Sequence, residues 1–66
     1  MKIIVNGKQK EIARASTLIS LVRELELNPE AIVAEHNGRI VARDEYDSLA
    51  LAENDTLELI RFVGGG

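Results

Sequence analysis

The glycines at the end of the chain, Gly64, Gly65 and Gly66, are the residues whose type and position favour a specific chemistry. Glycine has no Cβ, so three in succession form a thin, pliable strip of backbone that can enter a channel too narrow for side chains. We expect the tail to end in the free carboxylate of Gly66, which is ionised at neutral pH. An anionic carboxylate repels nucleophiles, so a partner must first activate it, and an acyl-adenylate made from ATP is the expected activated form. The alternative is a frayed terminus without a role.

Other kinds of site find little support in the residue types. The chain has no cysteine and one histidine, His36, so we expect no metal site and no disulfide. Gly7 and Gly38 are single turn residues without the spacing of a phosphate-binding loop. No base is placed to activate any of the candidate nucleophiles Ser16, Ser20 and Ser48. We therefore expect no catalytic residue and no cofactor of the protein's own.

Length and charge restrict the possible partners. With 66 residues the chain holds one domain at most, and 45% hydrophobic residues indicate a globular rather than a disordered chain. The net charge of −3, with one Phe and one Tyr, is unfavourable for binding nucleic acid. No apolar run approaches the roughly 20 residues needed to span a bilayer, and the N-terminus is too short for a signal peptide. We expect a soluble, cytoplasmic protein without nucleic-acid or membrane partners.

The first half of the chain predicts a hairpin followed by a helix. Residues 2–6 and 8–13 have strand character, with Ile12 pointing inward, and Asn6-Gly7 between them is a strong hairpin signal. Ser16 or Thr17 can cap a helix of about nine to eleven residues that ends at Asn28-Pro29. One apolar stripe at helical spacing comprises Leu18, Leu21, Val22 and Leu25.

The second half predicts three further strands. Residues 31–36 and 39–42 flank a second hairpin signal, Asn37-Gly38. A short helical turn is expected at residues 44–47, and Asn54-Asp55 turns the chain into a last strand over residues 56–63.

The resulting order, ββαβββ, is that of the β-grasp architecture, an α+β fold of the ubiquitin-like type with one helix packed on a mixed four- to five-stranded sheet. We predict a single β-grasp domain over residues 1–63 and a flexible glycine tail over residues 64–66.

The last strand predicts a docking surface at the base of the tail. A strand alternates its faces, so if Leu57 and Leu59 face the helix, Ile60 and Phe62 face solvent. Val33 on the neighbouring strand is expected to join them. Two or three exposed apolar residues on one face are typical of an interaction site. We therefore predict a partner-binding surface made of Val33, Ile60, Phe62 and Val63.

In this β-grasp order, several segments resemble the ThiS family, the sulfur carriers of thiamine biosynthesis. These segments are Val5-Asn6-Gly7-Lys8, Glu35-His36-Asn37-Gly38, Arg43-Asp44-Glu45-Tyr46 and Arg61-Phe62-Val63-Gly64-Gly65-Gly66. The resemblance covers the whole chain, although only the terminal Gly-Gly is chemically specific. The chain departs from the minimal family ending by one extra glycine, Gly64.

The resemblance implies a mechanism and partners. An adenylating enzyme (ThiF-like) uses ATP to activate Gly66, and sulfur supplied ultimately by a cysteine desulfurase converts it to a thiocarboxylate. Thiazole synthase (ThiG-like) then takes that sulfur to build the thiazole of thiamine. Gly65 matches the second glycine of the motif, and Ile60 and Phe62 match the apolar face that partners contact. The chain is a carrier and not an enzyme in this interpretation.

Three alternatives remain open from the sequence. The terminal Gly-Gly is shared with the small subunit of molybdopterin synthase, although those subunits are usually longer. It is also shared with ubiquitin-like modifiers, which are joined through the same carboxylate to lysines of other proteins. Finally, a non-covalent interaction module could have this fold, because fold does not determine function.

Overall fold

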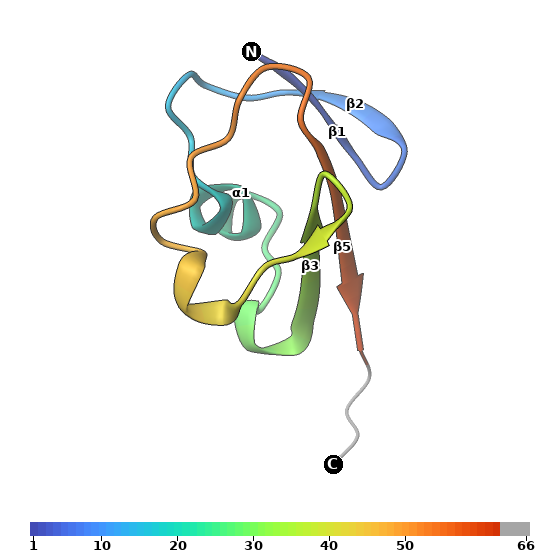
Figure 1. Ribbon diagram of the computed structural model, residues 1–66, viewed down its shortest axis with the longest axis vertical. Helices are drawn as coiled ribbons and strands as arrows, with labels where there is room; N and C mark the ends of the chain where they lie inside the picture. Colours follow the sequence, from blue (N-terminus) through green and yellow to red (C-terminus); the bar gives the residue numbers. More distant parts are fainter. Residues whose placement is uncertain (63–66) are drawn as a thin grey trace.

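A computed structural model describes residues 1–62, and the predictions for Val63 and the glycine tail lie outside the described residues (Figure 1). The elements over this range are β1 (Lys2–Val5), β2 (Lys8–Glu11), α1 (Leu18–Glu24), η1 (Pro29–Ala31), β3 (Ile32–His36), β4 (Arg39–Ile40), η2 (Arg43–Glu45) and β5 (Thr56–Arg61), where η denotes a 3₁₀ helix. The predicted order, ββαβββ, is confirmed.

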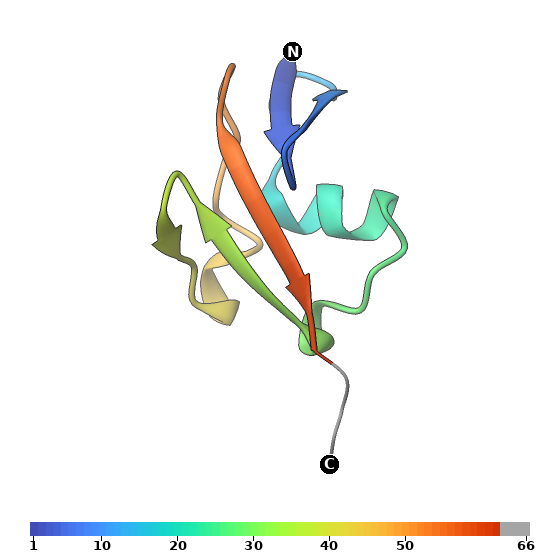
Figure 2. The same ribbon diagram turned by 90° about the vertical axis from the view of Figure 1, so that its right-hand side faces the viewer.

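The sheet is mixed, with β5 at its centre. Its strand order is β2-β1-β5-β3-β4. The first and last strands of the chain, β1 and β5, run parallel, while every other pair of neighbouring strands is antiparallel. The two ribbon views show α1 on one side of this sheet (Figures 1 and 2). This is the two-layer β-grasp arrangement expected from the sequence.

Both predicted hairpin turns are present, and both use the left-handed backbone conformation. Asn6 and Gly7 have φ angles of 50° and 82°, and Asn37 and Gly38 have 50° and 86°. Two successive residues with positive φ are characteristic of the type I′ turn, whose twist matches that of the flanking strands. The Asn-Gly pairs therefore determine where both hairpins reverse.

Thr17 caps α1, as one of the two predicted caps. Its side chain accepts a hydrogen bond from the Ser20 N–H, while the Ser20 side chain bonds the Thr17 N–H in return. Three residues of this helix, Leu18, Leu21 and Val22, are buried, which confirms most of the predicted stripe.

The predicted end of the helix at Asn28-Pro29 is wrong, since α1 ends at Glu24 after seven residues. Glu26 takes a left-handed conformation (φ 59°), and its N–H bonds the Arg23 carbonyl. The Leu27 N–H bonds the Val22 carbonyl, which completes a Schellman motif. The sequence signal was weak because glutamate, rather than glycine, occupies the left-handed position. Pro29 instead begins η1.

The remaining boundaries differ by a few residues. The strand predicted over residues 39–42 ends at Ile40. Val41, just beyond it, is buried in the core, and its N–H bonds the Ala34 carbonyl. The second strand ends at Glu11, and Ile12 is buried just beyond it. The helical turn expected at residues 44–47 is η2, which begins one residue earlier and ends two residues earlier.

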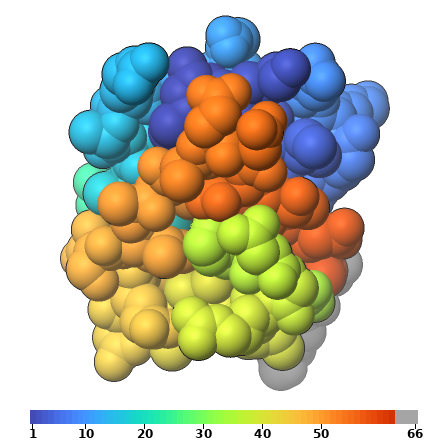
Figure 3. Space-filling model, turned by 45° about the horizontal axis from the view of Figure 1, so that its top comes forward, coloured from blue at the N-terminus to red at the C-terminus, as the bar shows by residue number. Residues whose placement is uncertain are grey.

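The hydrophobic core lies between α1 and the inner face of the sheet. The long segment before β5 also contributes Tyr46 and Leu51 to it, and Figure 3 shows this segment, in orange, between the N-terminal strands and the β3–β4 hairpin. Two hydrogen bonds of 2.9 Å, from the Leu18 N–H to Leu49 and from the Leu51 N–H to Ser16, fix that segment to the start of the helix. The buried core residues are Ile3, Ile12, Leu18, Leu21, Val22, Ile32, Ala34, Val41, Tyr46, Leu51, Leu57 and Leu59.

Candidate functional site

The two faces of β5 have opposite characters, as predicted. Leu57 and Leu59 point into the core and are 0% and 7% exposed, whereas Ile60 and Phe62 are 48% and 50% exposed. The alternation arises because successive side chains of a strand point to opposite faces, and α1 covers only the inner one. The strand that leads toward the glycine tail therefore carries exposed apolar side chains on its outer face.

The register of the sheet brings Val33 to these residues. Val33 of β3 lies directly opposite Ile60, and it is 36% exposed. Phe62 directly follows β5, and its N–H donates to the Ala31 carbonyl at 3.1 Å, so the backbone remains hydrogen-bonded to the segment before β3 as far as Phe62. The structure thus brings together the three predicted contact residues that it describes, Val33, Ile60 and Phe62. We call these three residues, with Ile40, the apolar patch.

Sequence reasoning missed how three residues of the outer face are arranged relative to one another. Ile40 of β4 is 67% exposed and lies opposite Glu35 of β3, which in turn lies opposite Glu58 of β5. The sequence predicted the alternation along each strand and the hairpin at Asn37-Gly38, but not the register of β3 against β5. This pairing gives the outer face an apolar patch and two neighbouring carboxylates.

Asn6 supports β5 from the side of β1. Its Oδ1 accepts a hydrogen bond from the Leu59 N–H at 2.8 Å, and its Nδ2 donates to the Leu59 carbonyl at 3.3 Å. The strand β1 has already ended at Val5, so the side chain of Asn6 substitutes for the next strand residue. The backbone beside Ile60 is thereby held in place.

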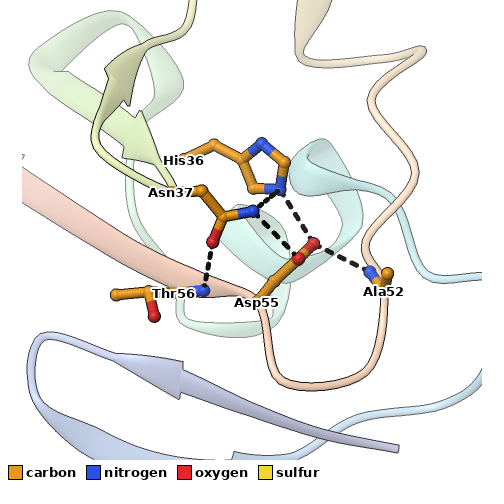
Figure 4. A network of polar contacts seen from close by, with 5 residues as sticks. All are labelled: His36, Asn37, Ala52, Asp55 and Thr56. Atoms are coloured by element: carbon orange, nitrogen blue, oxygen red, sulfur yellow. Dashed lines mark hydrogen bonds and ion pairs between the residues drawn. The ribbon is translucent and has the colours of Figure 1, made fainter.

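A polar network fixes the opposite end of β5 (Figure 4). The Nε2 of His36 lies 2.8 Å from Oδ2 of the buried Asp55, and Asn37 Nδ2 donates to Oδ1 of Asp55 at 3.1 Å. The Ala52 N–H also donates to Asp55 at 2.9 Å, while Asn37 Oδ1 accepts from the Thr56 N–H at 2.9 Å. Because a carboxylate accepts hydrogen bonds, the Nε2 of His36 carries the hydrogen.

This network controls the ionisation of Asp55. Burial raises the pKa of its carboxyl, whereas the hydrogen bond with His36 lowers it. Hydrogen bonds from Ala52 and Asn37, and the charge of His36, also lower this pKa. Together these effects hold the pKa of Asp55 below the ordinary value of an aspartate. His36 is thus the last residue of β3, beside the Asn37-Gly38 turn, and it pairs with Asp55.

A surface hollow of about 370 Å³ lies away from these residues. It is formed by α1, η1 and η2, and an ion pair between Arg43 and Glu30, at 3.2 Å, lies at its wall. The hollow includes none of the predicted site residues that the structure describes.

Residues 1–62 contain no group of three or more His, Asp or Glu side chains arranged to hold a metal ion. Over the same residues, no helix is long and apolar enough to cross a membrane.

Comparison with known proteins relates this fold and its tail to a family. The model of the ThiS family matches residues 3–66. The chain belongs to the ThiS family. The match extends from the first strand through the terminal glycines, and the resemblance seen in the sequence is confirmed.

Individual relatives agree with the family membership. The ThiS-family chain is 29% identical over 63 residues to the sulfur carrier protein ThiS of Bacillus subtilis, a match covering 94% of this chain and 96% of that one. The crystal structure of a thiamine biosynthesis protein (ThiS) from Geobacter metallireducens, 29% identical, superposes with a TM-score of 0.86 over 100% of both chains. This similarity confirms the β-grasp fold.

A third relative is much longer. A thiazole synthase of Paramagnetospirillum magneticum is 32% identical to the ThiS-family chain over 66 residues, which is 100% of this chain and 20% of that protein. The chain therefore spans about a fifth of the length of this relative.

Proposed function

We propose that this ThiS-family chain is a sulfur carrier of thiamine biosynthesis and that Gly66 is the residue that bears the sulfur. The observation that carries the proposal is the family match over residues 3–66, which includes the glycine tail. The relative from Bacillus subtilis, similar over nearly its whole length, is named a sulfur carrier protein. The chain itself has no catalytic residue in this proposal.

The chemistry proceeds at the Gly66 carboxylate. A carboxylate oxygen attacks the α-phosphorus of ATP on an adenylating enzyme, which forms an acyl-adenylate and releases pyrophosphate. Sulfur at the sulfide level, derived from cysteine through a desulfurase and a thiol reductant, then attacks the acyl carbon, displaces AMP and leaves a thiocarboxylate. Thiazole synthase consumes that sulfur, and the carboxylate of the carrier is restored.

The described part of the fold would act by docking. Val33 of β3, Ile60 of β5 and Phe62 form an exposed apolar surface, and the chain continues from Phe62 into Val63 and the tail. Contact with that surface would position the tail in the partner's active site, because β5 is held on both sides by β3 and Asn6. Similarity to a segment of a thiazole synthase supports that enzyme as a partner.

Mass spectrometry tests the proposal directly. The chain is incubated with the adenylating enzyme, ATP and a sulfur source, and its intact mass is measured. We expect the gain that corresponds to exchange of one oxygen for one sulfur at Gly66. An unchanged mass would contradict the proposal.

Two variants locate the reaction at the last residue. Deletion of Gly66, or addition of one residue after it, should abolish the mass gain while thermal melting stays unchanged. A non-covalent module would tolerate the added residue. A protein modifier would instead give a ladder of higher-mass adducts on immunoblots of cell extract, where a carrier gives essentially free protein.

A further inference from the structure

Two glutamates occupy directly opposite positions on neighbouring strands of the outer face of the sheet. Glu35 of β3 lies directly opposite Glu58 of β5. Glu35 shares the exposed face of Val33, two residues earlier, and Glu58 shares the face of Ile60, two residues later. Both carboxylates therefore adjoin the apolar patch.

Neither glutamate is in an ion pair within the described residues, 1–62. The third position of the same row, on β4, is the apolar Ile40. Like charges directly opposite each other on neighbouring strands destabilise a sheet. The isolated domain thus holds an unfavourable charge pair within an exposed apolar surface.

A binding partner can make this arrangement favourable. When an apolar surface docks and excludes water, a cation brought between two carboxylates interacts with both more strongly than it would in solvent. Arginine suits this position because its planar guanidinium presents several donors to carboxylates. Docking by apolar contact alone would leave Glu35 and Glu58 desolvated and unpaired, which is costly.

We propose that the outer face of the sheet binds thiazole synthase, and that thiazole synthase presents an apolar surface with an arginine or lysine beside it. The apolar contact covers Val33, Ile40 and Ile60, and the cation lies between Glu35 and Glu58. This inference rests on the proposed function, because thiazole synthase is the partner assigned there. Charge complementarity makes the two glutamates determinants of partner choice, and the apolar patch supplies contact area.

The inference predicts opposite effects on stability and on binding. Glu35→Gln and Glu58→Gln remove the repulsion while keeping the size and the polarity of the side chain. Each variant should melt at a higher temperature than the wild type. Each should also bind purified thiazole synthase about tenfold more weakly, and the double variant more weakly still. Binding by the wild type should weaken as salt is added, and binding by the double variant should depend less on salt.

Asp44→Asn is the matched control. Asp44 is exposed on η2, which lies on the side of α1, and its replacement changes the net charge by the same amount. This variant should bind thiazole synthase as the wild type does. If it weakens binding as much as Glu58→Gln, total charge rather than a local cation is responsible, and the inference is overturned.

Other outcomes separate the inference from the proposed function. If the wild type acquires sulfur and binds thiazole synthase, but the double glutamine variant binds equally tightly, the inference fails and the sulfur-carrier function stands. If the wild type acquires sulfur but does not bind thiazole synthase, the partner assignment and the inference both fail. If no sulfur is acquired, the proposed function fails, and the inference fails with it.

Discussion

Asn6 bonds both backbone groups of Leu59, accepting from its N–H at 2.8 Å and donating to its carbonyl at 3.3 Å. The two residues are 53 positions apart in the sequence. Asn6 also occupies a left-handed turn position (φ 50°), so one residue both reverses the first hairpin and extends the pairing of β1 with β5.

Replacing Asn6 with glycine should destabilise the domain. Asn6→Gly permits the positive φ angle but removes both hydrogen bonds to Leu59, so we expect the free energy of unfolding to fall by about 1–2 kcal/mol. Urea denaturation measures this, and hydrogen exchange should show loss of protection at the Leu59 amide. Asn54→Gly is the control, because Asn54 also has a positive φ (70°) and is in none of the side-chain hydrogen bonds within residues 1–62. Equal losses for both variants would contradict this role of Asn6.

The Asp55 network should make stability depend on pH in the acid range. The pKa of Asp55 is lower in the folded state than its ordinary value, so the ionised form stabilises the fold. This contribution is fully present above the pKa of the unfolded chain, near pH 4, and is lost as the pH falls through the lower, folded pKa.

Asp55→Asn tests this linkage. At pH 7 we expect the variant to be less stable by about 1–2 kcal/mol, because hydrogen bonds to a charged acceptor are stronger. The difference from the wild type should shrink as the pH is lowered below about 4, measured by urea denaturation at each pH. A difference that does not change with pH would show that the charge of Asp55 is irrelevant.

Glycine should be more favourable than glutamate at the end of α1. Glu26 has a left-handed conformation (φ 59°), which costs a residue with a Cβ roughly 1 kcal/mol, and its charge lies at the negative end of the helix dipole. Glu26→Gly should therefore raise the free energy of unfolding by about 1 kcal/mol. Glu26→Ala removes the charge but keeps the Cβ, so thermal melting of the two variants separates the effects. If alanine stabilises as much as glycine, the backbone conformation contributes nothing.

The two faces of β5 should respond differently to truncation. Leu57 is fully buried, so Leu57→Ala should cost about 2–5 kcal/mol, comparable to the whole stability of a domain this small. Ile60 is 48% exposed, so Ile60→Ala should change stability by much less and weaken partner binding instead. Circular dichroism and binding to thiazole synthase measure the two effects. Unfolding of Ile60→Ala would show that the outer face serves the fold.

Local patterns predicted most of the elements, for identifiable reasons. The Asn-Gly pairs at residues 6–7 and 37–38 mark both hairpin reversals, because few other residues tolerate two positive φ angles in succession. The stripe of Leu18, Leu21 and Val22 predicted α1. Its end was predicted wrongly because Glu26 carries none of the usual signals of a helix terminus.

The site was only partly predictable. Alternation along residues 57–62 indicated which side chains of β5 are exposed, and this is confirmed for Ile60 and Phe62. Alternation determines the face on which a side chain lies but not its neighbours on other strands. For this reason Ile40 and the opposition of Glu35 to Glu58 were missed.

By itself, the sequence determined the order of strands and helix, the two Asn-Gly turns, the amphipathic last strand and the glycine tail, because each depends on residues close together in the chain. The tertiary structure decided that β5 lies between β1 and β3. That position brings Asn6 to Leu59, His36 to Asp55 and Glu35 to Glu58. Such contacts join residues distant in the chain, and their register is set by packing of the whole sheet against α1, which no local pattern specifies.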